Sequence, residues 1–529
     1  MRVVVVGATG NVGSAVLEEL SARPEITSIL GLARRLPDAE AEPFCHAEWD
    51  SVDIQHPEST AALTELFSGA DAVIHLAWLI QPNSQRELLR RVNVHGTEHV
   101  LQAAAEAGVE RIAVASSVGA YSPVEDDHPR DESWPTEGIP GSHYSEDKAA
   151  QERVMDAFEA QHPGTALARL RPGLIFQAGS GSEIQRYFLG HLAPVQLLTM
   201  VRPPVVPMPS GIRAQAVHAR DVAKAYAEAV IQGARGAFNI AADDVLTGEA
   251  LASVISGREG KASITVPFAP LKPLVRSLHR ARLLPMDEGW LEMARRAPIM
   301  DISRARSTLG WNPEYSGTEA LSEMLEAMAD GAGRGSIPLR PRSVSALTEH
   351  PLPAEDHQLP SGIDTGLLRS YMADHLAGAT AGLNRIQAMA AAFEDTPVYP
   401  ELSQVAEAVG SEHQWLSRLI QSQGFSRPAV AAPALWLGER LSRVKPYARP
   451  LKRSPAALVL ETELMLGAVT AKRQGWEVLS DYAAELGVDR AVFEQLIEAA
   501  DDQREHLHRV HAYARPRVFR TDHATLSEE

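Results

Sequence analysis

Four polar side chains in the middle of this sequence have the types and spacing for redox chemistry. Tyr144 and Lys148 stand four residues apart, so on a helix their side chains share one face. An ammonium beside a phenol lowers the pKa of the phenol from about 10 towards the range of a proton shuttle. Ser116 and Ser117 follow an apolar run at 111–115, and a serine at a strand end can donate to a carbonyl. The alternative is a weakly coupled surface pair.

A glycine-rich stretch at the N-terminus supplies a binding element for such a reaction. An apolar run at 3–6 leads into Gly7, Gly10 and Gly13, and a helical pattern follows. Glycine lets the backbone approach a pyrophosphate, and a helix N-terminus presents N–H groups to it. The spacing is G-x-x-G-x-x-G rather than G-x-G-x-x-G, so a turn without a ligand is the alternative. With Tyr144, the stretch predicts a nicotinamide dinucleotide held against a tyrosine base.

The residues after the second predicted strand, 28–33, bear on which dinucleotide binds. An acid at that strand end binds the ribose of NAD, whereas arginine accommodates the 2′-phosphate of NADP. Arg34 and Arg35 stand there, and Asp38 follows only several residues later. Two guanidiniums can bind a phosphate by charge-assisted hydrogen bonds. The sequence therefore predicts NADP, with NAD as the second choice; the alternative is that both arginines are solvated loop charges.

Further motifs follow in a fixed order along residues 1–328. The chain thereby resembles the short-chain dehydrogenase/reductase superfamily in its extended, NAD-dependent epimerase/dehydratase form. The resemblance covers the fold of this part of the chain and implies an NAD(P)-dependent enzyme. The matching motifs, besides the glycine-rich stretch, Ser116-Ser117 and Tyr144-x-x-x-Lys148, are 71–77 (DAVIHLA), 93–97 (NVHGT), Tyr121, Arg171-Pro172, 217–223 (VHARDVA), 238–241 (FNIA), 301–306 (DISRAR) and 309–311 (LGW).

The resemblance also implies a role for each residue of the site. The reaction is hydride transfer at a carbinol or carbonyl carbon. Tyr144 would exchange a proton with the substrate oxygen, and Lys148 would lower the pKa of Tyr144 and bind the nicotinamide ribose. Ser117 stands four residues before Tyr121 and would donate to the substrate carbonyl, which leaves Ser116 as a packing residue. The implied dinucleotide contacts are Gly7, Thr9, Gly10, Asn11, Val12, Gly13, Arg34, Arg35, Asp53, Ile54, Leu76, Ala77, Asn93 and Lys148.

Three of the matching residues have structural alternatives. Asp53 matches a position against the adenine, but a loop or capping aspartate is equally compatible with the sequence. Asn93 belongs to a motif in which the asparagine is more often structural than catalytic. Asp221 stands where a strand leads into a helix, and we expect it to be the N-cap of that helix.

The substrate is indicated by residues that follow the sixth strand motif. Arg171-Pro172 has the proline form frequent among reductases and hydroxysteroid-type dehydrogenases, whereas sugar-nucleotide enzymes commonly carry an asparagine. Apolar residues at 197–206 would build an apolar pocket wall. We therefore expect a small, lipophilic alcohol or ketone. The alternatives are a nucleotide-sugar epimerase/dehydratase and a non-catalytic NADP-binding sensor with a helical output domain.

Composition sets limits on location and partners. At 529 residues the chain is too long for one ordinary domain. The net charge of −18 argues against nucleic-acid binding. The single cysteine, Cys45, fits a reducing compartment and is expected to be a buried apolar residue. The chain enters its first strand at once, and five prolines interrupt its most apolar region at 192–209, so we expect a cytoplasmic protein without a signal peptide or membrane span.

Strand and helix patterns alternate in the first part of the chain. This alternation predicts an α/β fold with a doubly wound, Rossmann-type parallel sheet. Two segments, 178–216 and 251–298, interrupt it, and by the resemblance they form a small substrate subdomain. The expected strands are 2–6, 28–33, 72–76, 111–115 and 166–171, and the expected helices are 11–21, 58–68, 85–107, 144–161 and 221–232.

The remainder of the chain has a different character. Residues 329–366 are rich in Pro, Ser and Gly and read as a linker. Apolar residues at three- and four-residue steps then predict an all-α domain at 367–516, similar to a four-helix bundle, before a tail at 517–529. Ser454-Pro455 and Asp489 can begin the third and fourth helices, and a short helix is expected near 433–443 in the crossover.

The bundle contains half of a di-iron motif. Glu505 and His508 have the E-x-x-H spacing, but both project away from the apolar stripe of their helix. Glu412 lacks a histidine three residues later. We therefore expect no metal and interpret the bundle as a device for homo-oligomerisation or docking.

Overall fold

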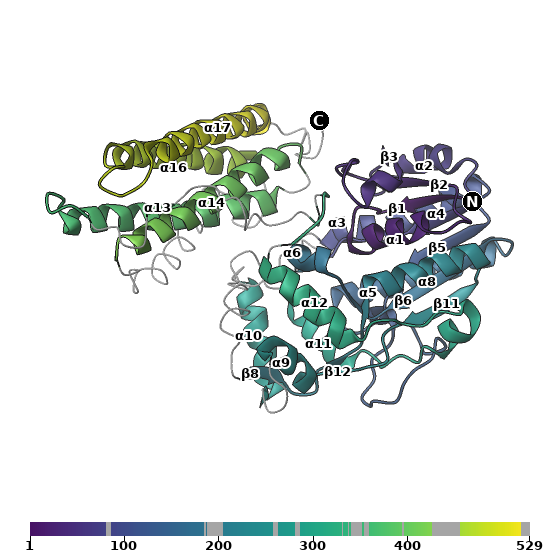
Figure 1. The fold of residues 1–529 in the computed structure, drawn as a ribbon. Helices are drawn as coiled ribbons and strands as arrows, with labels where there is room; N and C mark the ends of the chain where they lie inside the picture. Colours follow the sequence, from purple (N-terminus) through teal and green to yellow (C-terminus); the bar gives the residue numbers. More distant parts are fainter. Residues whose placement is uncertain are drawn as a thin grey trace. The chain divides into compact units, whose positions relative to one another are not determined.

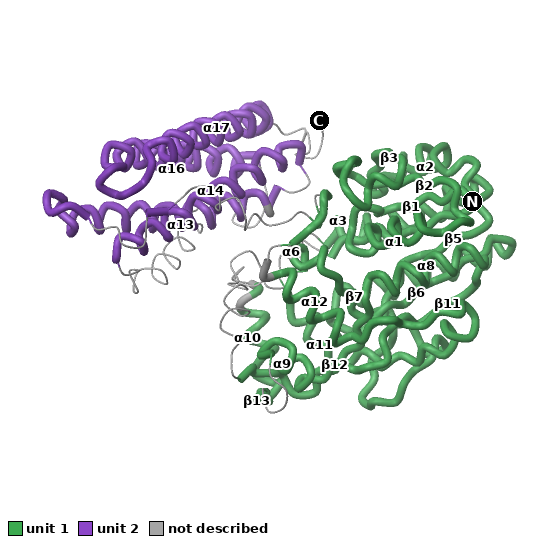
Figure 2. Tube along the Cα trace, viewed as in Figure 1, with its two compact units in different colours: residues 1–342 green, residues 343–529 purple. Residues whose placement is uncertain are grey.

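The computed structural model describes residues 1–80, 86–184, 187, 205–257, 263–280, 286–330, 332–336, 338–339, 352–353, 359–393, 396–425 and 455–519. The chain divides into two compact units, residues 1–342 and 343–529 (Figure 2). The division falls inside the segment predicted as a linker, 329–366. The described residues of that segment up to Leu339 fold with the first unit.

A seven-stranded parallel sheet forms the centre of the first unit. Its strand order is β11-β6-β5-β4-β1-β2-β3, so the order reverses direction at β1 and creates a switch point between β1 and β4. The predicted doubly wound α/β fold is confirmed. The strands are β1 (Arg2–Val6), β2 (Ser28–Ala33), β3 (Glu48–Ser51), β4 (Ala72–His75), β5 (Arg111–Ala115), β6 (Ala166–Pro172) and β11 (Gly236–Ile240).

Two of these strands, β3 and β11, were not among the predicted ones. The sequence of β3, EWDS, is mostly exposed at the sheet edge and has no apolar run.

The side chains of β1 alternate between the two faces of the sheet. Val3 and Val5 pack into one hydrophobic cluster, and Val4 and Val6 pack into another on the opposite face. Burial on both faces accounts for the continuous valine run.

Helices cover both faces of the sheet (Figure 1). Helices α1 and α8 pack on the face of Val3 and Val5, whereas α2, α4 and α5 contribute to the cluster of Val4 and Val6. The helix near 85–107 is divided by a π-helical turn at Arg91–His95. The bounds are α1 (Asn11–Ser21), α2 (Ser59–Phe67), α3 (Arg86–Arg90), α4 (Gly96–Glu106), α5 (His143–Gln161) and α8 (Ala219–Gln232).

The start of α8 corrects one prediction. His218 is the N-cap, because its Nδ1 accepts a hydrogen bond from the N–H of Arg220 at 3.1 Å. Asp221 lies in the first turn and accepts from the N–H groups of Glu314 and Tyr315 at 3.0 and 3.1 Å. The expectation that Asp221 caps α8 was wrong, since its carboxylate is used to fix a distant loop.

Short strand pairs and helices form the second layer of the first unit. Residues 197–204 of the expected pocket wall lie outside the described part of the chain. The paired strands are β7 (Leu174–Phe176) with β10 (Ala216–His218), β8 (Val206–Pro209) with β13 (Ser263–Val266), and β9 (Arg213–Ala214) with β12 (Leu246–Thr247). The helices are α6 (Gly181–Ile184), α9 (Gly248–Ser256), α10 (Phe268–Arg280), α11 (Glu288–Arg296) and α12 (Gly317–Asp330).

Cys45 lies in a single helical turn, Phe44–His46, between β2 and β3. Phe44 takes the inward position of this turn and is fully buried, whereas Cys45 is exposed. The expectation of a buried cysteine was therefore wrong.

The described part of the second unit is helical, as predicted. Its long helices are α13 (Thr365–Ala392), α14 (Tyr399–Ser422), α16 (Pro455–Asp481) and α17 (Arg490–Ala514). Asp489 caps α17 by accepting from the N–H of Ala491 at 2.9 Å. Trp415 packs edge-on against Trp476 and Phe493 in the core, with ring centroids 5.9 and 5.7 Å away. The helix expected near 433–443 and Ser454 lie outside the described residues.

One charged cluster lies inside this helical unit. Lys472 on α16 donates to the carboxylate of Glu412 on α14 and to Gln503 on α17, and Gln503 also donates to Glu412 at 2.6 Å. Glu505 and His508 of the E-x-x-H motif are exposed. The inward carboxylate of Glu412 is thus neutralised by the ammonium of Lys472.

Among the described helices, none combines the length and the apolar character needed to span a membrane.

Candidate active site

The glycine turn lies at the switch point of the sheet. Gly7 has a φ of +88°, and a Cβ there would lie 2.5 Å from the backbone nitrogen of Ala77, which follows β4. A Cβ on Gly13 would lie 2.5 Å from the carbonyl oxygen of Gly7. Gly10 precedes α1 without a side-chain cap, so the first N–H groups of α1 face the turn. The turn thus has the shape that admits a pyrophosphate at a helix N-terminus.

Nine of the other residues predicted to contact a dinucleotide lie at the same edge of the sheet. Thr9, Asn11 and Val12 belong to the turn and to the start of α1, and Leu76 and Ala77 follow β4. The remaining four follow the neighbouring strands: Arg34 and Arg35 after β2, and Asp53 and Ile54 after β3.

Two of these residues have local structural contacts. Asp53 accepts hydrogen bonds from the backbone and side-chain nitrogens of Gln55 at 3.1 and 2.7 Å. Ile54 is buried against Gly96 at the start of α4, where a Cβ would lie 2.8 Å from the Ile54 side chain. Asp53 therefore shapes the loop after β3, which is the structural alternative noted from the sequence.

Asn93 fixes the loop that follows β4. Its side-chain oxygen accepts from the N–H of Leu79 at 2.7 Å, and its amide donates to the carbonyl of Leu79 at 2.9 Å. The Asn93 side chain thus pairs with both backbone groups of Leu79, as a neighbouring strand would. These bonds orient the adjacent residue, Trp78. The contacts of Asn93 in the structure are therefore structural ones.

Tyr144 and Ser117 are brought together by the start of α5 and the end of β5. The ring of Tyr144 lies between Trp78 and Trp290, with centroid distances of 5.8 and 5.0 Å. Burial raises the pKa of Tyr144 to about 12, and a hydrogen bond with Ser117 opposes this shift. Ser117 Oγ also accepts from the N–H of Gly119 at 3.0 Å.

Lys148 is directed towards the end of β5 rather than towards the phenol. Its Nζ donates to the carbonyl of Ala115 at 2.7 Å and to Gln151 at 3.0 Å, and it lies 3.4 Å from the ring centroid of Trp78. Burial lowers the pKa of Lys148 well below its usual value, with the charges of Glu152 and Asp147 opposing. The spacing of Tyr144 and Lys148 places both residues on one face of the helix. The direction of the flexible Lys148 side chain is set by its contacts with Ala115, Gln151 and Trp78.

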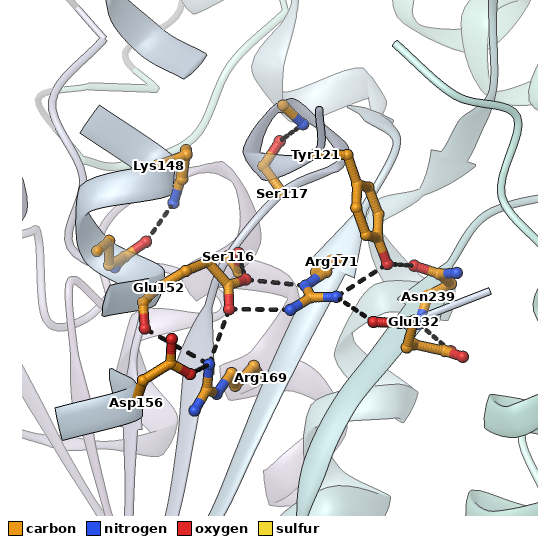
Figure 3. A network of polar contacts seen from close by, with 12 residues as sticks. Ser116, Ser117, Tyr121, Glu132, Lys148, Glu152, Asp156, Arg169, Arg171 and Asn239 are labelled. Carbon is orange, nitrogen blue, oxygen red and sulfur yellow. Dashed lines mark hydrogen bonds and ion pairs between the residues drawn. The ribbon is translucent and has the colours of Figure 1, made fainter. Parts of the chain in front are cut away.

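The two adjacent serines face different surroundings (Figure 3). Ser116 donates to Glu152 Oε1 at 2.5 Å. Ser117 instead lies beside Tyr144. Glu152 also binds Arg171 through two bonds of 2.8 and 3.0 Å and Arg169 through one of 3.0 Å. Burial would raise the pKa of Glu152, but the bonds and charge of Arg171 hold it at about 2.

This network continues from Arg171 in β6 through Tyr121 to Asn239 in β11. Arg171 donates to the hydroxyl of Tyr121 at 3.0 Å, and that hydroxyl donates to Asn239 at 2.6 Å. Burial raises the pKa of Tyr121 to about 12. Tyr121 and Arg171 thus act as buried anchors between β6 and β11.

Several residues of the site were missed by sequence reasoning. Glu152 had a signal, because it follows Lys148 by four residues on the same helix face. Trp78 follows Ala77 directly, but its contact with Tyr144 depends on the loop after β4. Trp290 and Met293 come from α11, and a Cβ on Gly119 would lie 2.9 Å from Tyr144 and 3.1 Å from the sulfur of Met293. No local pattern connects α11 with Tyr144.

The fold and this site define a class of protein. Residues 3–241 match the model of the NAD dependent epimerase/dehydratase family. This N-terminal part of the chain thus matches the family that the order of the sequence motifs predicted.

Individual relatives match different lengths of the chain. An uncharacterized protein of Mycobacterium tuberculosis is 26% identical over 367 residues, which are 68% of this chain and 34% of that protein. L-arabinose 1-dehydrogenase (NAD(P)(+)) of Haloferax volcanii is 33% identical over 118 residues, 22% of this chain and 41% of the relative. The chain thus spans less than half the length of both. The structure of dTDP-glucose 4,6-dehydratase from Streptomyces venezuelae, with NAD and TYD bound, aligns with a TM-score of 0.47 and 20% identity over 62% of this chain and 97% of that one.

Proposed function

We propose that the N-terminal unit is an NAD(P)-dependent oxidoreductase that acts at a carbinol or carbonyl carbon of a small, lipophilic substrate. One observation carries the proposal: Tyr144 packs against Gly119, whose N–H binds the hydroxyl of Ser117, at the same sheet edge as the Gly7 turn. The family match of residues 3–241 supports it. A binding protein without chemistry would not need a phenol and a hydroxyl together at this position.

The chemistry assigned to the chain's own residues is proton transfer and orientation. A bound dinucleotide supplies the two-electron acceptor or donor. Ser117 donates a hydrogen bond to the substrate oxygen, and Tyr144 exchanges a proton with that oxygen. Because burial holds the pKa of Tyr144 near 12, proton removal requires a nearby positive charge. Lys148 would provide that charge if its ammonium turned from Ala115 towards the phenol, and it would also hold the ribose of a bound dinucleotide.

The surroundings of Tyr144 favour an apolar ring or chain as substrate. Trp78 and Trp290 contact the phenol ring on two sides, and Met293 lies beside Gly119. Among the described residues, the indole N–H of Trp78 is buried without a hydrogen-bond partner, so a substrate acceptor would satisfy it. These groups provide apolar walls with one polar contact, which suits a lipophilic ketone.

Two other functions are distinguished by simple assays. The family match keeps a nucleotide-sugar epimerase/dehydratase as the second candidate. Epimerisation would appear as a new sugar product without net change in NADPH absorbance. A sensor would bind the dinucleotide without turnover of any carbonyl compound or nucleotide sugar.

The experiment that tests the catalytic assignment replaces Tyr144 by phenylalanine in the full chain. We expect kcat to fall about 100- to 10,000-fold while the dissociation constant of the dinucleotide changes little. Tyr315→Phe is the matched control, because Tyr315 stacks on His218 instead of contacting Tyr144. Unchanged turnover in Tyr144→Phe would exclude the proposed role of the phenol.

We further propose that NADP is preferred over NAD because Arg34 and Arg35 follow β2. Replacing both by alanine should weaken NADPH about tenfold or more and NADH much less. Arg235→Ala is the control, since Arg235 binds the carbonyls of residues 163–165 at the opposite edge of the sheet. Equal losses for both dinucleotides would refute recognition of the 2′-phosphate.

A further inference from the structure

The segment after α12 folds back onto the first unit. We call residues 332–336 with 338–339 the C-terminal strap. Inside the strap, the N–H of Arg334 donates to the carbonyl of Leu339 at 2.7 Å, and the N–H of Ser336 donates to the carbonyl of Arg334 at 2.8 Å. Leu339 is fully buried and Ser336 is 4% exposed. The strap is therefore a packed part of the unit, although its sequence was read as a linker.

The strap contacts the two loops to which dinucleotide binding is assigned. The hydroxyl of Ser336 donates to the carbonyl of Thr9, in the glycine turn, at 2.8 Å. The carbonyl of Gly335 accepts from the N–H of Asp38, in the loop after β2, at 2.8 Å. A Cβ on Gly335 would lie 2.9 Å from the Cβ of Ala41 in the same loop. One short segment thus joins the pyrophosphate turn to the loop that begins with Arg34 and Arg35.

Arg334 extends these contacts to helix α1. Its guanidinium binds Glu18 on α1 at 2.5 Å and the side-chain oxygen of Gln177 at 3.3 Å. Gln177 in turn donates to the backbone and side-chain oxygens of Asn11 at 2.7 and 2.8 Å. Asn11 is the first residue of α1. Arg334 is therefore connected to both ends of the first two turns of the helix whose N-terminus faces the phosphate site.

We propose that Arg334 and Ser336 are positioning residues of the dinucleotide site. They act through Thr9, Gln177 and Glu18, and they hold the glycine turn and the start of α1 in the geometry that receives the pyrophosphate. The proposal rests on the proposed function, because it requires that the first unit binds a dinucleotide. A loop that is ordered before binding loses less conformational entropy when the ligand arrives. Loss of the strap contacts therefore weakens the dinucleotide complex.

The test uses Ser336→Ala and Arg334→Ala in the full chain, with Arg235→Ala as the matched control. Dissociation constants for NADH and NADPH are measured by nicotinamide fluorescence, and amide hydrogen exchange is followed at residues 7–13. We expect each strap variant to weaken both dinucleotides about fivefold and to speed exchange in the turn. Arg334→Lys should recover only part of the affinity, since an ammonium reaches Glu18 but lacks the planar fork that also binds Gln177.

The outcomes separate the strap from the proposed function. Wild-type protein that binds neither dinucleotide contradicts the proposed function, and the role of the strap with it. Wild-type binding together with unchanged constants and unchanged exchange in both strap variants overturns the positioning role alone. An equal loss in Arg235→Ala also overturns it, because the effect would then reflect general destabilisation. A rise in the KM for the dinucleotide that exceeds the fall in kcat supports it.

Discussion

The two units of this protein both bury a glutamate side chain. The two carboxylates differ in the number and the kind of their hydrogen-bond partners. In the first unit, the Glu152 carboxylate receives hydrogen bonds from Arg169, Arg171 and Ser116, and the network continues through Tyr121. In the second unit, Glu412 is bound by Lys472 and Gln503. The first network joins α5 to β5 and β6, whereas the second joins three helices of one core.

This difference indicates what each cluster does. The network of Glu152 fixes the helix of Tyr144 and Lys148 against the strand end that presents Ser117. Precise placement of these groups matters for chemistry, because small displacements cost reactivity. The cluster of Lys472 neutralises the inward carboxylate of a helical core, where burial lowers the pKa of the lysine. We infer that the first cluster serves catalysis and the second serves specific packing.

The largest effect is expected from Glu152→Ala. It leaves the buried guanidinium of Arg171 without its carboxylate and removes one of the three carboxylates that bind Arg169, so the free energy of unfolding should fall by about 3–5 kcal/mol. Turnover should fall as well, because α5 loses the hydrogen bond that joins Glu152 to Ser116 at the end of β5. Urea unfolding followed by circular dichroism measures the change. Asp156→Ala is the control, since Asp156 binds the same Arg169 but is 63% exposed; equal effects of both variants would contradict a special role of Glu152.

The next largest effect is expected in the helical unit. Lys472→Ala leaves Glu412 buried without its cation and should lower the free energy of unfolding by about 3 kcal/mol, with dinucleotide affinity unchanged. The double variant Lys472→Met with Glu412→Leu should recover most of this loss. Arg473→Ala removes an exposed neighbouring pair and serves as the control. A change in dinucleotide affinity in Lys472→Ala would disprove the separation of the two clusters.

A smaller loss of stability is expected when the polar contacts of Asn93 are removed. Asn93→Ala removes both bonds to Leu79 and should cost about 2 kcal/mol of stability. It should also alter tryptophan fluorescence, because the loop of Trp78 is released. Thermal unfolding and emission spectra measure both quantities. Asn312→Ala changes an exposed asparagine and should change neither; a similar result for both variants would remove Asn93 from the site's framework.

Between pH 7 and pH 6 the smallest effect on stability is expected from the protonation of His75. Burial, together with the charge of Lys148, lowers the pKa of His75 to about 3 from the ordinary value of 6.5. The unfolded chain thus binds more protons between these values, so stability is complete above pH 6.5 and falls as the pH falls towards 3. The slope is at most about 1.4 kcal/mol per pH unit. Urea midpoints at pH 7, 6 and 5 should show a shallower slope in His75→Gln, and an unchanged slope would contradict this origin.

Glu152 contributes in a lower pH window, which overlaps that of His75 between pH 3 and 4.5. Its folded pKa of about 2 lies below the ordinary 4.5, so its contribution is complete above pH 4.5 and is lost as the pH falls through 2. The two groups are therefore distinguishable by the pH at which stability begins to fall.

The sequence by itself determined the elements that local chemistry specifies. The valine run of β1, the glycine turn, the face shared by Tyr144 and Lys148 and the Asp489 cap follow from periodicity, glycine conformation and capping, and each involves residues close in the chain. These features predicted the doubly wound sheet and the helical second unit.

Only the tertiary structure decided which distant groups meet. The direction of Lys148, the contact of Trp290 with Tyr144 and the placement of the strap on Thr9 depend on partners from other elements. Cys45 is exposed because Phe44 takes the inward position. Such choices are made by packing and by the satisfaction of buried polar groups, which act between residues far apart in sequence.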